Sequence, residues 1–198
     1  MSHIFILPGW DDSGPDHWQS RWAVLHGTQE ARFTRVEQDD WHQPLRGDWM
    51  MRLDETLMVE APSSADPVVL VAHSLGCHLV AAWAAHSRHV GRVKAALLVA
   101  PPDLDGPDAS ATVPPQLHGW RRVVRQALPF PALMLASSND PYGTAARSAG
   151  LAHDWGAEFE VLGPMGHVNA ASGQGDWPEG WARLQDWLAT IPVKPPAD

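Results

Sequence analysis

The clearest candidate for chemistry in this chain is Ser74, which stands two residues after an apolar run at residues 68–72. Residues 72–76 read A-H-S-L-G, a variant of the pattern G-x-S-x-G with Ala at the first small position. In that pattern the serine sits on a sharp strand-to-helix turn with its hydroxyl exposed above a sheet. We therefore predict that Ser74 is a nucleophile. The plainer alternative is a serine that only caps an ordinary helix.

A serine hydroxyl needs a neighbouring base before it can attack a carbonyl carbon. Asp140 follows an apolar run at 132–137, and His167 lies in a glycine-containing loop after residues 158–162. The chain order serine, acid, histidine is that of the α/β-hydrolases. We predict that His167 takes the Ser74 proton as general base and that Asp140 holds the imidazole tautomer.

Other interpretations of these two residues stay open at the level of sequence. Asp103, Asp105 and Asp108 follow the preceding predicted strand, and one of them is an alternative to Asp140 as the acid. Asp140 also precedes a proline, which is a good helix-capping sequence in its own right. His167 has the alternative of being a loop histidine without a chemical task.

The loop after the first predicted strand, residues 7–14, is a candidate for stabilising negative charge. Acyl transfer needs backbone N–H donors aimed at the developing oxyanion. We expect one donor from Leu75 and one from Trp10, with Gly9 permitting the turn, although Pro8-Gly9 is also ordinary turn punctuation. The candidate substrate-contacting residues, for which burial in the core is the alternative, are Gly9, Trp10, His73, Leu75, Leu104, Trp120 and Trp177.

The elements that position these residues are continuous apolar runs separated by stretches of helical spacing. Continuous runs are typical of strands buried on both faces of a parallel sheet. The predicted strands of this kind are 4–7, 68–72, 95–100 and 132–137, and weaker strand signals stand at 33–36 and 158–162. The predicted helices are 17–26, 45–59, 75–86, 144–155 and 177–188. This alternation predicts an α/β fold with about six parallel strands and helices on both faces, in one domain of residues 1–192 with a flexible tail at 193–198.

Five segments together resemble the small α/β-hydrolases related to retinoblastoma-binding protein 9 and the bacterial YdeN proteins. They are residues 7–14 followed by D-H-W at 16–18, Q-D-D-W at 38–41 with Pro44, residues 71–76, residues 138–142, and G-H-V-N-A-A-S-G-Q-G-D-W-P-E-G at 166–180. The resemblance covers nearly the whole chain and implies an α/β-hydrolase core whose triad is Ser74, Asp140 and His167. Residues 57–60 lack the cysteine of the L-x-C-x-E motif, so binding to retinoblastoma protein is not expected.

Composition excludes several other classes of protein. The 198 residues carry a formal net charge of −9, which argues against nucleic-acid partners and anionic membrane surfaces. A single cysteine excludes a disulfide framework. The first residues lack the pattern of a signal peptide, so we expect a cytoplasmic protein. We expect no metal, because the H-x-x-H at 86–89 has no apparent third ligand, and no cofactor, because no glycine-rich nucleotide motif follows the first strand.

These observations predict a serine hydrolase that cleaves an ester, or less readily an amide or peptide bond, through an acyl-Ser74 intermediate. The alternative is a catalytically weak protein of the same fold that serves as a protein-interaction module. The sheet and its helices use almost the whole chain, which leaves only residues 101–118 as a possible lid. We therefore expect a shallow, open site without a cap domain, suited to small or medium apolar acyl groups.

Overall fold

The computed structural model describes residues 2–27, 31–63 and 67–192, and the predicted tail at 193–198 lies outside them. Its centre is a six-stranded sheet in the order β2-β1-β3-β4-β5-β6, in which every neighbouring pair is parallel. The strands are β1 (Ser2–Leu7), β2 (Ala31–Arg35), β3 (Val68–His73), β4 (Val93–Val99), β5 (Ala132–Ser137) and β6 (Glu158–Leu162). The predicted parallel sheet of about six strands is confirmed.

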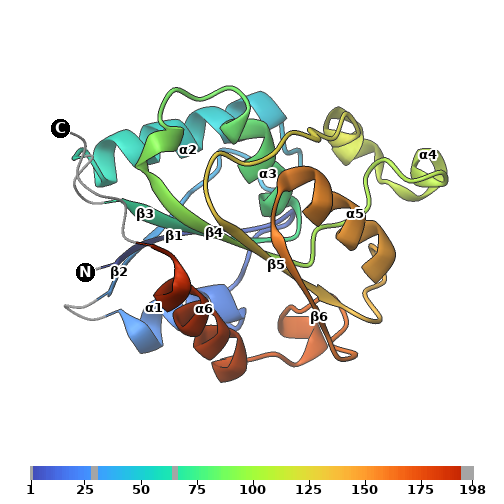
Figure 1. The fold of residues 1–198 in the computed structure, drawn as a ribbon. Helices are drawn as coiled ribbons and strands as arrows, with labels where there is room; N and C mark the ends of the chain where they lie inside the picture. Colours follow the sequence, from blue (N-terminus) through green and yellow to red (C-terminus); the bar gives the residue numbers. More distant parts are fainter. Residues whose placement is uncertain (1, 28–30, 64–66, 193–198) are drawn as a thin grey trace.

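Helices cover both faces of the sheet (Figure 1). On one face lie α2 (Arg46–Glu60), α3 (Leu75–Ala84) and α5 (Ala145–Trp155), and on the other lie α1 (Trp18–His26) and α6 (Pro178–Thr190). The short helix α4 (Ala109–Thr112) lies outside these layers, and short 3₁₀ helices occupy Val90–Arg92, Pro115–Trp120 and Ala170–Ser172. No helix within the described ranges is long and apolar enough to cross a membrane.

Burial explains why the central strands read as continuous apolar runs. Every residue of β3 and of β5 is buried, because both strands have a neighbour on each side and helices above and below. The edge strands β2 and β6 are only half-buried, and their sequences were accordingly the weaker strand signals. The gradient from centre to edge follows from the two covered faces of a parallel sheet.

Tryptophans fill much of the space between the sheet and the helices. The largest fully buried side chains include Trp18, Trp22, Trp49, Trp83, Trp120, Trp155 and Trp177. A buried indole needs an acceptor for its N–H, and in most of these residues that acceptor is a backbone carbonyl of a loop. Trp18 Nε1, for example, donates to Val168 O at 2.8 Å. The tryptophans therefore fasten loops to the core as well as filling it.

The strand order places a functional edge at one end of the sheet. The chain runs from β1 outward to β2 and then crosses back to β3 on the other side of β1. Such a reversal opens a crevice at the carboxyl ends of the two strands, where open α/β sheets bind ligands. The loop carrying Trp10 leaves β1 at this point, and Ser74 leaves β3 beside it.

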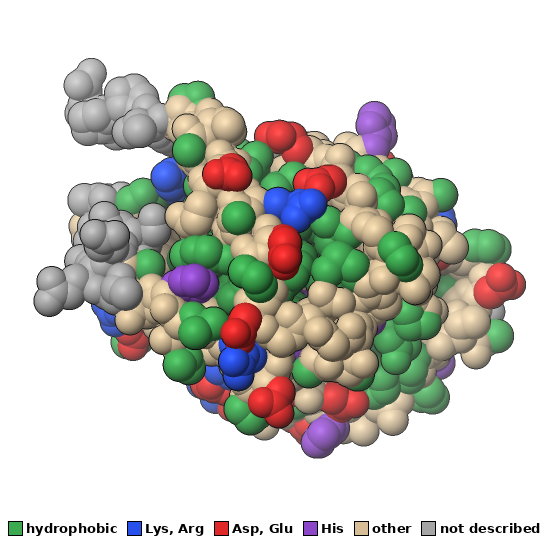
Figure 2. Space-filling view, turned by 90° about the horizontal axis from the view of Figure 1, so that it is seen from below, with side chains coloured by type: hydrophobic (Ala, Val, Ile, Leu, Met, Phe, Trp, Pro, Cys, Tyr) green, Lys and Arg blue, Asp and Glu red, His purple; other side chains and the backbone are tan. Residues whose placement is uncertain are grey.

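On the face covered by α1 and α6, acidic and basic side chains are interspersed and form no patch of a single sign (Figure 2). Ion pairs contribute to this mixture, including Arg21 with Asp176 and Arg183 with Glu160. The described residues of this face therefore form no extended basic surface of the kind that binds a phosphate backbone.

Candidate active site

Ser74 occupies the turn between β3 and α3 in a conformation that few non-glycine residues adopt, with φ 53° and ψ −123°. Its N–H donates to Val99 O at 2.9 Å, which fixes the turn against β4. The Ser74 side chain makes no capping bond to the helix, so the plain helix-cap alternative is wrong. A Cβ at Gly76 would lie 2.4 Å from Leu7 O, which explains why the second small position of the motif is glycine.

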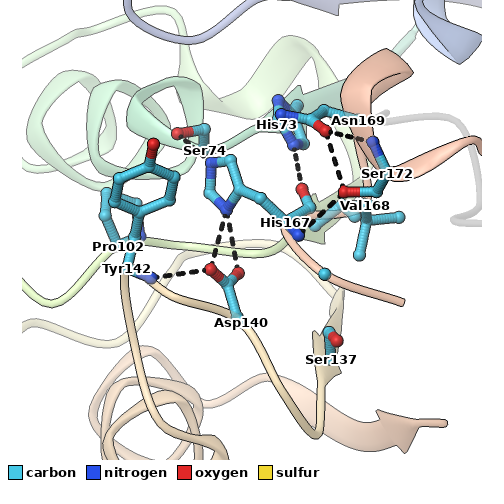
Figure 3. Close-up of polar contacts among 12 residues, drawn as sticks. His73, Ser74, Pro102, Ser137, Asp140, Tyr142, His167, Val168, Asn169 and Ser172 are labelled. Carbon is cyan, nitrogen blue, oxygen red and sulfur yellow. Dashed lines mark hydrogen bonds and ion pairs between the residues drawn. The ribbon is translucent and has the colours of Figure 1, made fainter. Parts of the chain in front are cut away.

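His167 joins Ser74 to Asp140 (Figure 3). Its Nε2 lies 2.9 Å from Ser74 Oγ, and its Nδ1 lies 3.0 and 2.9 Å from the two carboxylate oxygens of Asp140. The Asp140 side chain is 4% exposed and that of His167 10%. With Nδ1–H donated to a carboxylate, Nε2 is left as the acceptor for the serine hydroxyl proton.

Two of the three alternative acids bind arginines, and the third is exposed. Asp103 binds Arg147, with distances of 2.8 and 2.9 Å between the guanidinium and carboxylate atoms. Asp105 binds both Arg147 and Arg125. Asp108 lies at the start of α4 and is exposed. Among the aspartates weighed from the sequence, Asp140 is the one that contacts His167.

The loop that carries His167 is held on one side by the end of β5. Ser137 Oγ accepts from Met165 N–H at 3.0 Å, and Asn139 Oδ1 accepts from Gly166 N–H at 2.7 Å. Asp140 follows these two residues directly, so the same strand end positions the carboxylate and the histidine loop. Their relative placement therefore depends on a few local bonds rather than on long side chains.

The other side of this loop is held by residues from three further elements. His73 Nε2 bonds to His167 O at 2.9 Å, and Ser172 Oγ accepts from His167 N–H at 3.1 Å. The Trp18 bond to Val168 O completes the set. His73 thus points to the backbone of the histidine loop and holds it, while still lining the cavity described below.

The predicted oxyanion residues flank the serine. Leu75 is the first residue of α3, and a first-turn N–H has no acceptor within its own helix. Gly9 packs so closely that an added Cβ would lie 2.7 Å from Ser74 Cβ. Trp10 follows it, and its indole donates to His42 O at 3.2 Å. Oxyanion binding by Leu75 and Trp10 stays a prediction.

A cavity of about 960 Å³ opens in front of Ser74. Its volume is near the upper end of the range of roughly 300–1,000 Å³ that is usual for small-molecule sites. Residues between 102 and 117 build one wall, together with residues of the loops after β1 and β5. The site is therefore larger than the shallow one expected, because the segment at 101–118 is folded into one of its walls.

The structure assigns the predicted pocket residues to three groups. Trp10, His73, Leu75 and Leu104 line the cavity. Gly9 packs beneath Ser74 and is not part of the lining.

The third group, Trp120 and Trp177, was predicted wrongly. Trp120 is 1% exposed and donates to Pro44 O, and Trp177 is 2% exposed and packs against Trp18 and Trp22. Both rings serve the core because large apolar surface gains most where it is fully removed from water.

Burial governs the protonation of the groups around Ser74. It lowers the pKa of His73 well below its usual value and, together with the neighbouring His167, lowers the pKa of His17 to about 4. Burial raises the pKa of the Cys77 thiol, which therefore stays protonated and unreactive. Within the described residues, no three His, Cys, Asp or Glu side chains are grouped to hold a metal ion.

Three residues that line the cavity were not predicted from the sequence. Tyr142 lies edge-on to the His167 ring with centroids 4.6 Å apart, and its N–H donates to Asp140 Oδ1 at 2.9 Å. Arg147 and His17 line the cavity. Tyr142 and His17 lie inside the segments that carry the family resemblance, which was the available signal. Arg147 stands in a predicted helix with no motif to mark it.

Residues 4–186 match the serine hydrolase family. The protein belongs to this family, and its sheet is that of the α/β-hydrolase superfamily. Comparison with curated proteins found no match. The resemblance to YdeN-like proteins is confirmed by two solved structures. A YdeN-like hydrolase of Pectobacterium atrosepticum is 27% identical with a TM-score of 0.78, over 96% of this chain and 94% of that one. The ydeN product of Bacillus subtilis is 17% identical with a TM-score of 0.74, over 96% and 100% of the two chains.

The same fold extends to a thermophilic esterase of Thermogutta terrifontis, which is 13% identical with a TM-score of 0.64 over 98% of this chain and 91% of that one. That identity is too low to carry more than the fold. Over its described residues, this small serine hydrolase has the α/β-hydrolase core without a separate cap domain, as predicted. It is a hydrolytic enzyme.

Proposed function

We propose that this serine hydrolase cleaves carboxylic esters through a covalent acyl-Ser74 intermediate, with His167 and Asp140 completing a catalytic triad. One observation carries the proposal. The 2.9 Å contact between Ser74 Oγ and His167 Nε2 continues through Nδ1 to Asp140, at the mouth of a cavity large enough for a substrate. Nucleophile, base and orienting carboxylate are within hydrogen-bond reach of one another, as this chemistry requires.

The proposed reaction has two halves. His167 accepts the Ser74 proton as the hydroxyl oxygen attacks the ester carbonyl, and the Leu75 and Trp10 N–H groups stabilise the tetrahedral oxyanion. Collapse expels the alcohol, which takes the proton from His167. Water then attacks the acyl-serine with His167 again as base, which releases the acid and restores the hydroxyl. Asp140 keeps Nδ1 protonated and stabilises the imidazolium formed in each half.

The cavity walls support neutral, small to medium acyl groups. Leu104, Val113 and Leu117 contribute apolar surface, and Arg147 is already paired with Asp103 and Asp105. A substrate anion would therefore compete with two aspartates for that guanidinium. An uncharged ester avoids the competition and buries its acyl chain against the leucines.

An active-site fluorophosphonate tests the nucleophile directly. We expect it to label the wild-type protein and not Ser74→Ala, while Ser87→Ala, a matched change in the turn after α3, still labels. Turnover of p-nitrophenyl butanoate should fall at least about 10³-fold in His167→Ala. Labelling of Ser74→Ala would contradict the assignment. If the wild type neither labels nor turns over any acyl ester, it instead fits the catalytically weak interaction module.

A further inference from the structure

His17 caps helix α1, and the capping hydrogen bond fixes the tautomer of its ring. Its Nδ1 accepts a hydrogen bond from Gln19 N–H at 3.2 Å. A neutral imidazole has one donor and one acceptor nitrogen. Because Nδ1 is the acceptor, the ring proton is on Nε2, on the side of the ring away from the helix backbone.

The Nε2–H of His17 is buried and has no hydrogen-bond partner. The residue is only 5% exposed. The described residues with such an unpaired buried side-chain atom are His17, Gln38, Arg92 and Arg121, and among them His17 is the one that lines the cavity. Leaving a buried donor without an acceptor costs free energy. Because this nitrogen is shielded from solvent, an acceptor that arrives with the substrate reaches it by displacing the side chains that cover it.

The position of the ring puts the donor next to the reacting groups. The His17 ring packs on the His73 ring with centroids 4.7 Å apart, and His73 packs on His167 with centroids 4.9 Å apart. One ring therefore separates His17 from the proposed base. The lowered pKa of His17 keeps it uncharged near neutral pH, so it offers a single neutral N–H and no positive charge. Such a donor suits an uncharged oxygen acceptor.

We propose that the His17 Nε2–H binds the substrate and selects esters with a second, uncharged oxygen acceptor a few bonds from the scissile carbonyl. Ether, hydroxyl and carbonyl oxygens belong to this class, and all-hydrocarbon esters do not. The inference deepens the proposed function and rests on it, because it assumes that the cavity in front of Ser74 receives an ester. His17 is here a specificity-determining residue and takes no part in proton transfer.

Isosteric ester pairs separate this role from general catalysis. p-Nitrophenyl methoxyacetate and p-nitrophenyl butanoate differ by an ether oxygen in the acyl group, and 2-methoxyethyl butanoate and butyl butanoate differ by one in the alcohol. For each pair the measured quantity is the selectivity, which is the kcat/KM of the ether ester divided by that of its hydrocarbon partner. Intrinsic reactivity cancels when selectivities of variant and wild type are compared.

Three variants divide the functions of the side chain. His17→Asn keeps a good helix cap, but its amide is too short to place a donor at the Nε2 position. His17→Gln is long enough to restore a donor there. His26→Asn is the matched control, because His26 lies at the other end of α1 with its ring stacked on Trp181.

We expect His17→Asn to lower the selectivity about 10-fold in at least one ester pair, His17→Gln to recover most of it, and His26→Asn to match the wild type. The pair that responds shows whether the acceptor belongs to the acyl group or to the alcohol. Equal losses for both members of each pair, or unchanged selectivity in both pairs, would overturn the proposal.

Binding to Ser74→Ala gives a readout that does not depend on turnover. We expect this variant to bind 2-methoxyethyl butanoate or methyl methoxyacetate more tightly than butyl butanoate or methyl butanoate, and expect His17→Asn in the same background to remove the preference. Equal binding of ether and hydrocarbon esters would contradict the role of His17 even if the wild type hydrolyses both. A wild type that hydrolyses no ester contradicts the proposed function instead.

Discussion

The turn that carries Ser74 depends on two glycines from different parts of the chain. Ser74 holds a positive φ, a conformation that costs a non-glycine residue free energy and persists only where its surroundings impose it. Gly76 leaves room for Leu7 O, and Gly9 leaves room for the Ser74 side chain itself. Glycine is therefore required at both positions, because any other residue would add a Cβ that collides with Leu7 O or with Ser74.

Gly9→Ala tests this packing at the level of one methyl group. The added Cβ would lie 2.7 Å from Ser74 Cβ and 3.2 Å from Ser74 Oγ, so the serine or the loop must shift. A displacement near 1 Å can reduce the rate about 10²-fold, and we expect a loss of that size in kcat/KM with an unchanged circular dichroism spectrum. Gly14→Ala on the same loop, where a Cβ meets nothing within 4 Å, is the control. Wild-type kinetics in Gly9→Ala would contradict this prediction and show that the loop accommodates the added methyl group without displacing Ser74.

At the scale of elements, the wall at 101–118 is tied to α5 by a network of ion pairs. Arg147 of α5 binds Asp103 and Asp105, and Arg125 binds Asp105 and Asp154. Asp103 and Asp105 belong to the wall, so the network is a clasp between the wall and the helix that follows Asp140.

Arg147→Gln should loosen the wall. The change removes the contact of the guanidinium with both carboxylate oxygens of Asp103. A partly exposed ion pair of this kind contributes about 1 kcal/mol to stability. We expect faster amide hydrogen exchange in residues 103–117 and a KM a few-fold higher, with a smaller change in kcat. Arg183→Gln, which breaks a pair with Glu160 on the opposite face, should leave the exchange of the wall as it is. Unchanged exchange in Arg147→Gln would mean that apolar packing alone holds this segment.

At the scale of the whole molecule, the core encloses histidines that stay neutral. Burial lowers the pKa values of His17 and His78 to about 4, and that of His73 well below the usual range. The unfolded chain protonates these rings near pH 6.5. Between about pH 6.5 and 4 the unfolded state therefore binds more protons than the folded state, so the free energy of unfolding falls as the pH falls.

We accordingly expect a marked loss of thermal stability between pH 7.5 and pH 5. At pH 5, a single histidine with a folded-state pKa of about 4 lowers the free energy of unfolding by about 2 kcal/mol. His78→Gln should reduce this pH dependence, because an amide can still donate to Pro102 O, which His78 Nε2 contacts at 2.8 Å, and does not titrate. Thermal melts of both proteins across this range give the measurement. A wild-type melting temperature that does not change down to pH 5 would contradict the account.

The sheet and the serine turn were predictable because their signals are local. A strand buried on both faces must be apolar along its whole length, as β3 and β5 are, and the tight turn after β3 restricts residue size within five consecutive positions. The order of serine, acid and histidine along the chain also belongs to the sequence. The choice of acid does not, since four aspartates after two neighbouring strands all satisfied that order.

Tertiary structure decided what depends on contacts between distant residues. His167 meets Asp140 across 27 positions and Ser74 across 93, and Arg147 engages Asp103 and Asp105 from a helix that carries no motif. The packing of these elements buried Trp120 and Trp177 in the core. It also left the buried Nε2–H of His17 without a hydrogen-bond acceptor. The sequence by itself determined the fold and the family and predicted Ser74 as the nucleophile, because short-range sterics and burial leave local patterns in the chain. The shape of the cavity and the unpaired N–H of His17 arise only when separate elements pack. Both depend on which side chains from distant parts of the chain lie close to each other.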